Sequence, residues 1–192
     1  MAKAVANKGM IVVHQVNNIN ESSQVNAILE KFYAFINDYR RAPDRLSSFI
    51  LCLDQEISFK DFEKVFWSFL KKLYVMDRKN YSHDPRVSAD ENSENFSYSI
   101  MEEAFFILAL HPQSPRFSRR FLKPAIVFNP HQQFEQLRKD GIFGRLRDII
   151  RKRDKLLQGF INPMLKDFGE KSEVFQYLGK MYKENDTNPL LT

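Results

Sequence analysis

The run AFFILAL at residues 104–110 constrains the fold most, because it is apolar throughout. Such a run is typical of a central strand of a buried sheet. PAIVFN at 124–129 predicts a second buried strand, and SSFILCLD at 47–54 predicts a third. FSYSIM at 96–101 alternates large apolar residues with small polar ones, which is the period of a half-buried strand. We therefore expect an antiparallel or mixed sheet of about four strands.

Helical patterns surround these strands. Apolar residues recur at helical spacing over 25–39 and form one wide face over 59–73, where Ser58 and Asp61 resemble a capping box. Further helices are predicted at 130–138, 142–158 and 172–184, the last with Ser172 as its N-cap. A small sheet flanked by helices is the α+β class.

The length of 192 residues predicts one domain, which we place at residues 22–185. Residues 1–21 show neither the helical nor the strand periodicity of apolar residues. They are expected to be a loose N-terminal tail, with a short strand at 11–13 as the one possible exception. Residues 186–192 are expected to form a C-terminal tail.

The composition, with 43% hydrophobic and 28% charged residues, is that of a folded soluble protein. No apolar run approaches the roughly 20 residues of a membrane-spanning helix, and the first residues lack the apolar core of a signal peptide. We therefore expect a cytoplasmic protein without membrane contact. The single cysteine, Cys52, excludes an internal disulfide, a Cys-based zinc site and a cysteine-ligated cluster.

The net charge of +5 is unevenly distributed, because residues 116–155 are rich in Arg and Lys. A basic half suits an anionic partner such as a carboxylate, a phosphate or nucleic acid. Nucleic acid is the weakest of these, because the basic helix at 145–158 carries Asp148 and Asp154 rather than interleaved aromatics. That helix has the pattern of an ordinary amphipathic helix.

Common catalytic motifs are absent from the sequence. It has no Gly-rich phosphate loop, no G-x-S-x-G and no H-E-x-x-H. The presence of only six glycines in total also argues against a dinucleotide-binding fingerprint. Chemistry must therefore be sought in less standard arrangements.

Residues 111–135, HPQSPRFSRRFLKPAIVFNPHQQFE, hold two of the four histidines. His111 ends a strand, where functional side chains are common, although a polar strand end explains it as well. His131 and Glu135 are four residues apart on a predicted helix, which suits either a surface pair or an imidazole whose tautomer is fixed by a carboxylate. Arg119 and Arg120 can grip carboxylates or phosphates, or simply form a solvated loop. The segment therefore suits an anionic, metal-bearing cofactor, with two polar loops around a buried strand as the alternative.

The ordered blocks HPQSPRFSRRF, FNPHQQFEQLR, IRKRD, INPMLKDFGEKSE and QYLG resemble the YqcI/YcgG family. The resemblance covers about residues 25–182 and is specific from Phe96 onward. The family includes haem-dependent guanidine N-hydroxylases of guanitoxin-type pathways. The resemblance thus implies an oxidoreductase that holds haem, activates O2 and hydroxylates a guanidine nitrogen of an arginine-like small molecule.

The resemblance also directs attention to particular residues. An axial imidazole for the iron would come from His131, supported by Glu135, or from His111. The propionates would be neutralised by three cations: Arg116, Arg119 and Arg120. A carboxylate for the guanidinium would be Glu173 or Asp167. An external electron donor, a reductase or ferredoxin, is implied because no flavin or iron–sulfur motif is encoded.

The sequence departs from the family pattern in several places. The upstream Phe-Pro-Cys segment has no counterpart, and Phe175 and Leu178 stand where Arg and Ser are expected. Met101 and Glu102 replace two glycines of a tight turn between strands, where positive φ costs Met or Glu roughly 1 kcal/mol each. These departures keep two alternatives open: a non-catalytic relative that binds haem or a small ligand, and, less favoured, a basic nucleic-acid-binding module.

Overall fold

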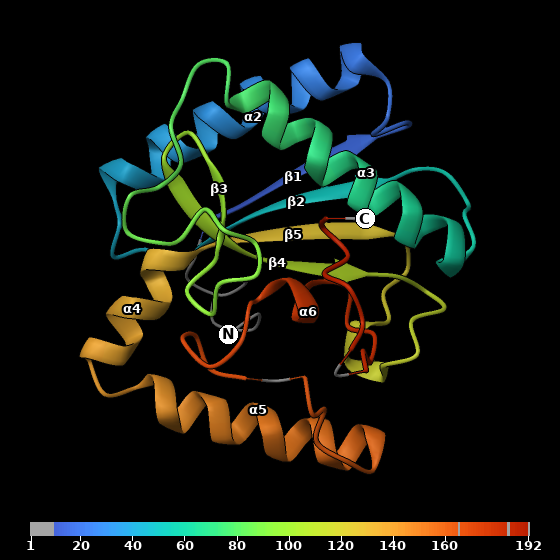
Figure 1. Cartoon of the computed structure of the whole chain (residues 1–192), viewed down its shortest axis with the longest axis vertical. Helices are drawn as coiled ribbons and strands as arrows, with labels where there is room; N and C mark the ends of the chain where they lie inside the picture. Colours follow the sequence, from blue (N-terminus) through green and yellow to red (C-terminus); the bar gives the residue numbers. More distant parts are fainter. Residues whose placement is uncertain (1–9, 165, 184, 192) are drawn as a thin grey trace.

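The computed structural model describes residues 10–164, 166–183 and 185–191. Its centre is an open, mixed sheet with the strand order β1-β2-β5-β4-β3 (Figure 1). Only β1 and β2 are parallel, and every other neighbouring pair is antiparallel. The strands are β1 (Met10–Val16), β2 (Ser47–Leu53), β3 (Tyr98–Ile100), β4 (Glu103–Leu110) and β5 (Ala125–Pro130).

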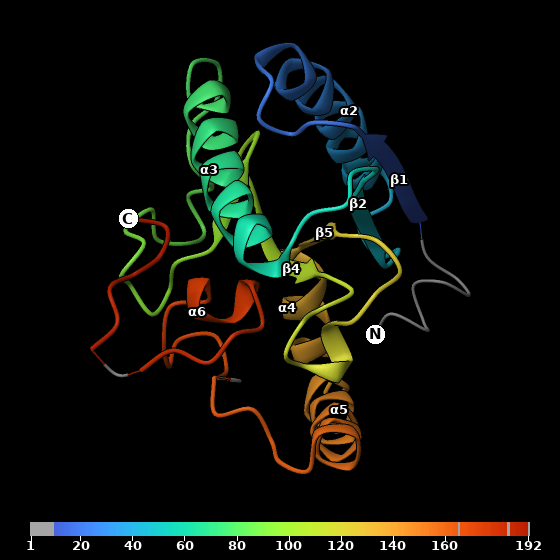
Figure 2. The ribbon, with the colours of Figure 1, turned by 90° about the vertical axis from the view of Figure 1, so that its right-hand side faces the viewer.

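The helices lie on both sides of this sheet (Figures 1 and 2). On one face are α2 (Ser22–Arg41) and α3 (Phe59–Asp77), while α4 (His131–Lys139), α5 (Phe143–Gln158) and α6 (Val174–Tyr177) lie on the other side. The start of α3 is capped as the sequence predicts, because the Ser58 hydroxyl accepts a hydrogen bond from the Asp61 amide at 3.1 Å. The predicted α+β class with one sheet is confirmed.

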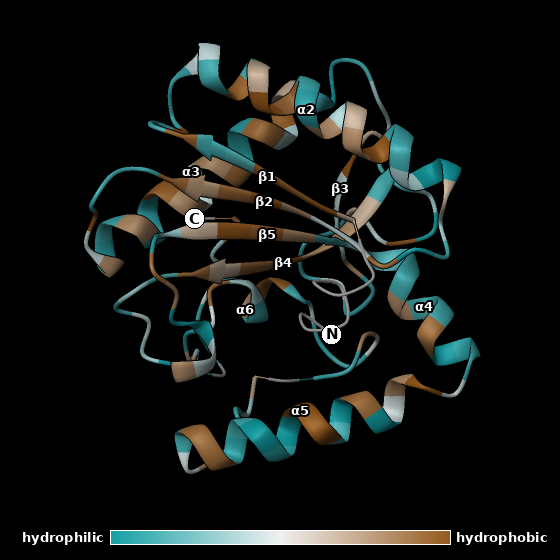
Figure 3. Ribbon diagram, turned by 180° about the vertical axis from the view of Figure 1, so that it is seen from behind, coloured by the Kyte–Doolittle hydropathy of each residue, from teal (hydrophilic) through white to brown (hydrophobic). Residues whose placement is uncertain are grey.

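Phenylalanine fills the core between α2, α3 and the sheet. The Phe32 ring of α2 lies 4.2 Å from that of Phe49 on β2 and 4.8 Å from that of Phe128 on β5, measured between centroids. On the opposite face, Phe106 of β4 contacts Phe134 of α4 and Tyr177 of α6. In Figure 3 brown dominates β5 and much of β2 and β4, which agrees with the apolar runs that predict these three strands, whereas β1 is partly teal.

The N-terminal segment differs from the prediction. Within the predicted loose tail, where a short strand was considered only at 11–13, residues 10–16 form β1, which pairs along its whole length with β2 and makes a fifth strand. The reason is that β1 is an edge strand whose pairing partner lies more than thirty residues away, and a local period does not reveal such pairing. The rest of the predicted tail before residue 10 lies outside the described residues.

The C-terminal segment also differs. The helix predicted at 172–184 is only the single turn α6, and residue 184 lies outside the described residues. Ser172 does not cap it, because its hydroxyl donates to the Glu91 carbonyl at 2.7 Å. Within the predicted tail 186–192, Asn188 and Leu190 are buried, and Leu190 joins the hydrophobic core. Residue 192 is not described.

The turn between β3 and β4 is as strained as the sequence predicts. Met101 and Glu102 have φ values of 50° and 57°, in the left-handed region that favours glycine. Both carboxylate oxygens of Asp77 accept from the Met101 amide at 3.1 Å, and Arg40 donates to the Met101 carbonyl at 2.6 Å. These bonds hold a conformation that costs roughly 1 kcal/mol per residue.

Candidate functional site

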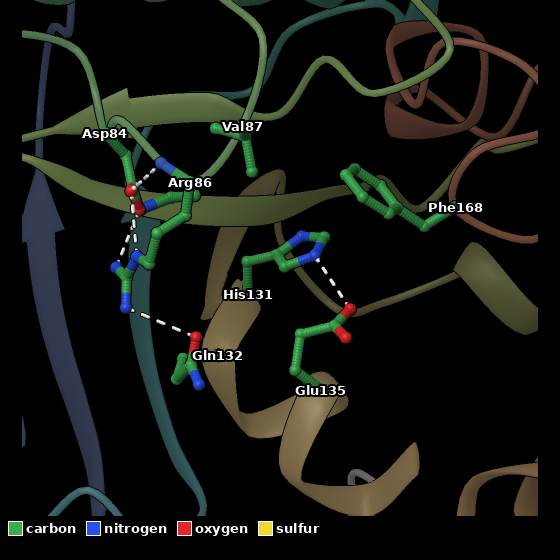
Figure 4. A pocket seen from close by; sticks show the side chains of 8 residues that line it. Asp84, Arg86, Val87, His131, Gln132, Glu135 and Phe168 are labelled. Carbon is green, nitrogen blue, oxygen red and sulfur yellow. Dashed lines mark hydrogen bonds and ion pairs between the residues drawn. The ribbon is translucent and has the colours of Figure 1, made fainter. Parts of the chain in front are cut away.

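A cleft of about 220 Å³ opens where β5 passes into α4 (Figure 4). Four segments that are separate in the sequence form it: the loop around Asp84–Val87, the start of β4, the first turns of α4, and the segment that holds Phe168. Of the predicted site residues, His131 and Glu135 line this cleft. The rest of the lining is Asp84, Arg86, Val87, Ala104, Gln132 and Phe168.

His131 is the first residue of α4, so the end of β5 fixes its backbone and its ring forms a wall of the cleft. Its Nε2 lies 3.3 Å from a carboxylate oxygen of Glu135, and its ring meets the Phe168 ring edge-on at 4.4 Å between centroids. Since the Glu135 carboxylate can only accept a hydrogen bond, Nε2 of His131 carries the proton, and Nδ1 keeps its lone pair. Nδ1 is buried and has no hydrogen-bond partner among the described residues. Burial lowers the pKa of His131, so the ring is neutral at pH 7.

Glu173 lies behind His131, with a carboxyl oxygen 3.7 Å from Nδ1. Complete burial raises the pKa of Glu173 to about 8, despite the hydrogen bond that its other oxygen accepts from the Ser97 hydroxyl at 2.9 Å. At pH 7 Glu173 therefore holds a proton while His131 is neutral. The two groups are not an ion pair; they are a buried acid facing a vacant imidazole lone pair.

A network of charges forms the opposite wall. Buried Asp84 accepts from Arg86 Nε at 2.8 Å and from its terminal nitrogen at 2.7 Å. Arg86 also reaches Glu103 at 3.0 Å and Gln132 at 3.2 Å (Figure 4 shows the bonds to Asp84 and Gln132). Because its partners come from the 84–86 loop, β4 and α4, Arg86 ties together three elements around the cleft.

Beyond Arg86 lies a second hollow of about 420 Å³, which shares Asp84, Arg86 and Gln132 with the first. Tyr39 and Arg40 of α2 and Glu102 of the strained turn also line it. The Tyr39 hydroxyl is buried and has no hydrogen-bond partner in the described part of the chain. Burial, with Glu103 nearby, raises the pKa of Tyr39 far above its usual value, so the hydroxyl is a neutral donor.

His111 lies at the opposite end of the sheet. Along the β4–β5 pair, Leu110 is opposite Ala125 and Phe105 is opposite Pro130, so the two histidines are separated by about 17 Å of strand. Both ring nitrogens of His111 are bonded to backbone, Nε2 to the Ile57 carbonyl and Nδ1 to the Gln113 amide, each at 3.0 Å. The ring packs against Phe59 and Phe62, so no ring nitrogen is left to hold a metal.

The three predicted propionate-binding arginines lie at this second end and not beside His131. Arg116 is buried in a pair with Asp154 at 2.8 Å, and Arg120 donates to the Ser114 carbonyl at 3.0 Å. Arg119 donates to the Gln176 carbonyl at 3.2 Å; burial, followed by the charge of Arg116, lowers its pKa to about 9. A Cβ at Gly179 would come within 2.9 Å of the Arg119 side chain, so this packing needs the glycine of the QYLG block.

Asp167 does not reach the cleft either, because it pairs with Arg147 and Arg151 of α5 at 2.5 and 3.7 Å. The sequence interpretation missed Asp84, Arg86, Gln132 and Phe168. No local signal marked the first two, which lie in a polar loop, whereas Phe168 lies inside the DFGEKSE segment. Among the residues that the structure describes, no group of three or more His, Cys, Asp or Glu side chains is arranged to hold a metal ion.

Comparison with known proteins decides the family. Residues 1–190 match the YqcI/YcgG family. The chain belongs to this family. It is similar to two uncharacterized proteins of Bacillus subtilis (strain 168): YcgG, at 31% identity over 122 residues, and YqcI, at 32% over 120 residues. These matches cover 62% and 60% of the chain but 47% and 46% of the relatives, so the matched region spans about half the length of each.

No solved structure matches this chain significantly. The YqcI/YcgG assignment therefore rests on sequence, and the fold comes from the structure described above. In the described part of the chain, no helix is both long enough and apolar enough to cross a membrane.

Proposed function

We propose that this YqcI/YcgG-family protein is a haem-dependent monooxygenase that hydroxylates a guanidine nitrogen of an arginine-like small molecule in the cytoplasm. The sequence blocks that resemble the guanidine N-hydroxylases support the proposal. The observation that carries it is His131, a buried, neutral imidazole in the wall of a cleft, with one ring nitrogen that lacks a hydrogen bond. His111, with both nitrogens occupied, is withdrawn as an axial ligand.

The residues at the cleft fit one part of a haem site. A neutral imidazole supported by a carboxylate is a suitable axial ligand, and a haem supplies the oxygen chemistry when bound. The propionate contacts do not fit, because Arg116, Arg119 and Arg120 are bonded to internal partners at the far end of the sheet. We therefore assign only the axial role, to His131; because its free Nδ1 lies 3.7 Å from the Glu173 carboxyl, that carboxyl would have to move for Nδ1 to bind iron.

The remaining roles follow from charge. Glu135 lines the cleft and is part-exposed, but its carboxylate already accepts from His131 and pairs with Arg138, so a substrate guanidinium would bind it by displacing Arg138. Glu173 holds a proton beside the His131 ring at neutral pH. An arginine-like ligand that extends past Arg86 would place its carboxylate near Arg40 and the unpartnered Tyr39 hydroxyl in the second hollow.

A second candidate function is binding of the same small ligand without catalysis. The three arginines predicted to bind the haem propionates lie far from the cleft, which favours this second candidate. The cleft volume of about 220 Å³ also favours it, because typical ligand sites have roughly 300–1,000 Å³. Nucleic-acid binding remains the least favoured proposal, because no described feature adds to the basic charge that first suggested it.

The visible spectrum of protein produced with added haem precursor tests the first proposal. We expect a Soret band that disappears in His131→Ala and persists in His111→Gln, the matched control at the other end of the sheet. Calorimetry with arginine measures ligand binding independently of haem. A band that survives His131→Ala would refute the axial assignment, and arginine binding without any band would select the second candidate.

A further inference from the structure

Helix α5 turns its polar side toward the domain, the reverse of an ordinary surface helix. Arg147, Arg151, Asp154 and Gln158 recur every three or four residues, and all four bond inward. The arginines pair with Asp167, while Asp154 pairs with buried Arg116. The Gln158 side chain accepts from the Phe117 amide at 2.9 Å and donates to the Pro115 carbonyl at 3.2 Å. Polar bonds thus attach α5 to the domain.

The apolar residues of α5 consequently point outward. Along the helix and its two ends, seven large apolar side chains are between 42% and 78% exposed. Figure 3 shows brown segments along α5, which forms one outer edge of the molecule. We call these residues the α5 ridge: Ile142, Ile149, Ile150, Leu156, Leu157, Phe160 and Ile161. Several exposed large apolar side chains gathered on one side of a helix are typical of an interaction site.

Basic side chains accompany the ridge. On a wheel of 100° per residue, Arg145 and Lys152 flank it on the side away from the domain, and Arg153 lies within it. These three side chains and Lys155 are exposed, against a single exposed acidic residue of α5, Asp148. An apolar centre with a cationic border is complementary to an acidic protein surface. A second copy of the chain would bring like charges together.

A chain of side-chain contacts connects the start of α5 to the cleft. His131 contacts Glu135, Glu135 pairs with Arg138, and the Arg138 guanidinium lies 4.3 Å from the centroid of Phe143, the first residue of α5. The nine-residue helix α4, about 14 Å long, links His131 to this point. The start of α5 is therefore the part of the ridge nearest the cleft, whereas Leu156 and Leu157 lie about 20 Å further along the helix, so a partner must extend along α5 to approach His131.

We propose that the α5 ridge is the docking surface for an acidic electron-donor protein of the ferredoxin type. This rests on the proposed function, because hydroxylation with O2 consumes two electrons that the chain itself cannot supply: one oxygen atom enters the substrate and the other leaves as water. The apolar ridge supplies the buried centre of the interface, and the cations orient the acidic partner.

The test is direct binding of an acidic plant-type [2Fe–2S] ferredoxin, measured by calorimetry at low and high salt. We expect salt-weakened binding that falls about tenfold or more in Leu156→Asp combined with Leu157→Asp, and by a similar factor in Lys152→Glu combined with Lys155→Glu. The matched control, Lys60→Glu with Lys79→Glu, changes two exposed lysines on and just after α3 and should bind as the parent does. Far-UV circular dichroism verifies that each variant is folded.

Three outcomes would overturn the proposal. These are no binding of the ferredoxin, binding that both α5 variants leave unchanged, and a ridge occupied instead by a second copy of the chain or by anionic phosphatidylserine vesicles. Sedimentation velocity and vesicle flotation detect the last two. Because none of these measurements uses the Soret band, a failure of the docking surface is distinguishable from a failure of the proposed function.

Discussion

The two ends of the β4–β5 strand pair each carry a buried histidine, yet the two sites differ in how their polar atoms are bonded. At the His111 end, both ring nitrogens are bonded to backbone, and Arg116 and Arg119 are bonded to partners inside the protein, although Arg116 Nε and one terminal nitrogen of Arg119 lack a hydrogen-bond partner among the described residues. At the His131 end, one ring nitrogen and the Tyr39 hydroxyl are buried without partners, and a protonated carboxyl faces the ring. Buried polar groups are normally satisfied. Since unsatisfied groups occur at both ends, the difference lies in the histidines themselves: the His131 ring lines a cleft and keeps a free nitrogen, whereas both nitrogens of the His111 ring are bonded.

The largest expected effect concerns the buried acid at the His131 end. Below pH 4.5 Glu173 is protonated in both the folded and the unfolded chain, so its ionisation does not favour unfolding. Between pH 4.5 and about 8 the unfolded chain ionises while the folded chain keeps the proton, so stability is lost as the pH rises through this window. We expect the free energy of unfolding to fall by up to roughly 5 kcal/mol over this range. Glu173→Gln, which cannot ionise, should remove most of this slope. Urea unfolding at both ends of the range measures it, and an unchanged slope in the variant would place the titration elsewhere.

The two histidines themselves give the next largest effect. His111→Ala leaves a cavity between Phe59 and Phe62 and an unpaired Ile57 carbonyl, so we expect a loss of roughly 2–4 kcal/mol. His131→Ala removes a ring that borders a cleft and already lacks one hydrogen bond, and should cost about 1 kcal/mol. Equilibrium unfolding of both variants gives the ranking. Equal losses would mean that the bonding difference between the two ends has no energetic consequence.

The smallest effect concerns the strained turn at the rim of the second hollow. Within the described residues, Met101 and Glu102 are the only non-glycine residues with positive φ, and both lie at the His131 end. Glu102→Gly should raise the free energy of unfolding by roughly 0.5–1 kcal/mol. The control Glu102→Ala removes the same carboxylate but keeps a Cβ, so it should gain nothing. A similar gain in both variants would show that charge, and not backbone strain, limits stability here.

Local sequence was sufficient for much of the fold. Apolar runs predicted β2, β4 and β5, alternation indicated β3, and amphipathic spacing with the Ser58 cap predicted α2 and α3, because each of these signals comes from residues within a few positions of one another. The strain at Met101 and Glu102 was expected from the family resemblance, which places two glycines at these positions. For the edge strand β1, the sequence indicated only a short strand at 11–13; its full length and its place in the sheet depend on pairing with β2 across the whole of α2.

For the candidate site, the sequence by itself determined residue types and one local contact, the pair His131–Glu135, which helical spacing makes adjacent. Only the tertiary structure decided that His111 and the arginines belong to the other end of the sheet, and that Glu173, Asp84, Arg86 and Phe168 approach His131. The antiparallel pairing of β4 with β5 is the physical reason, because it places the two ends of the segment 111–131 at opposite ends of the strand pair. The pKa of Glu173 is set by burial, and that burial depends on segments about forty residues or more away in the sequence.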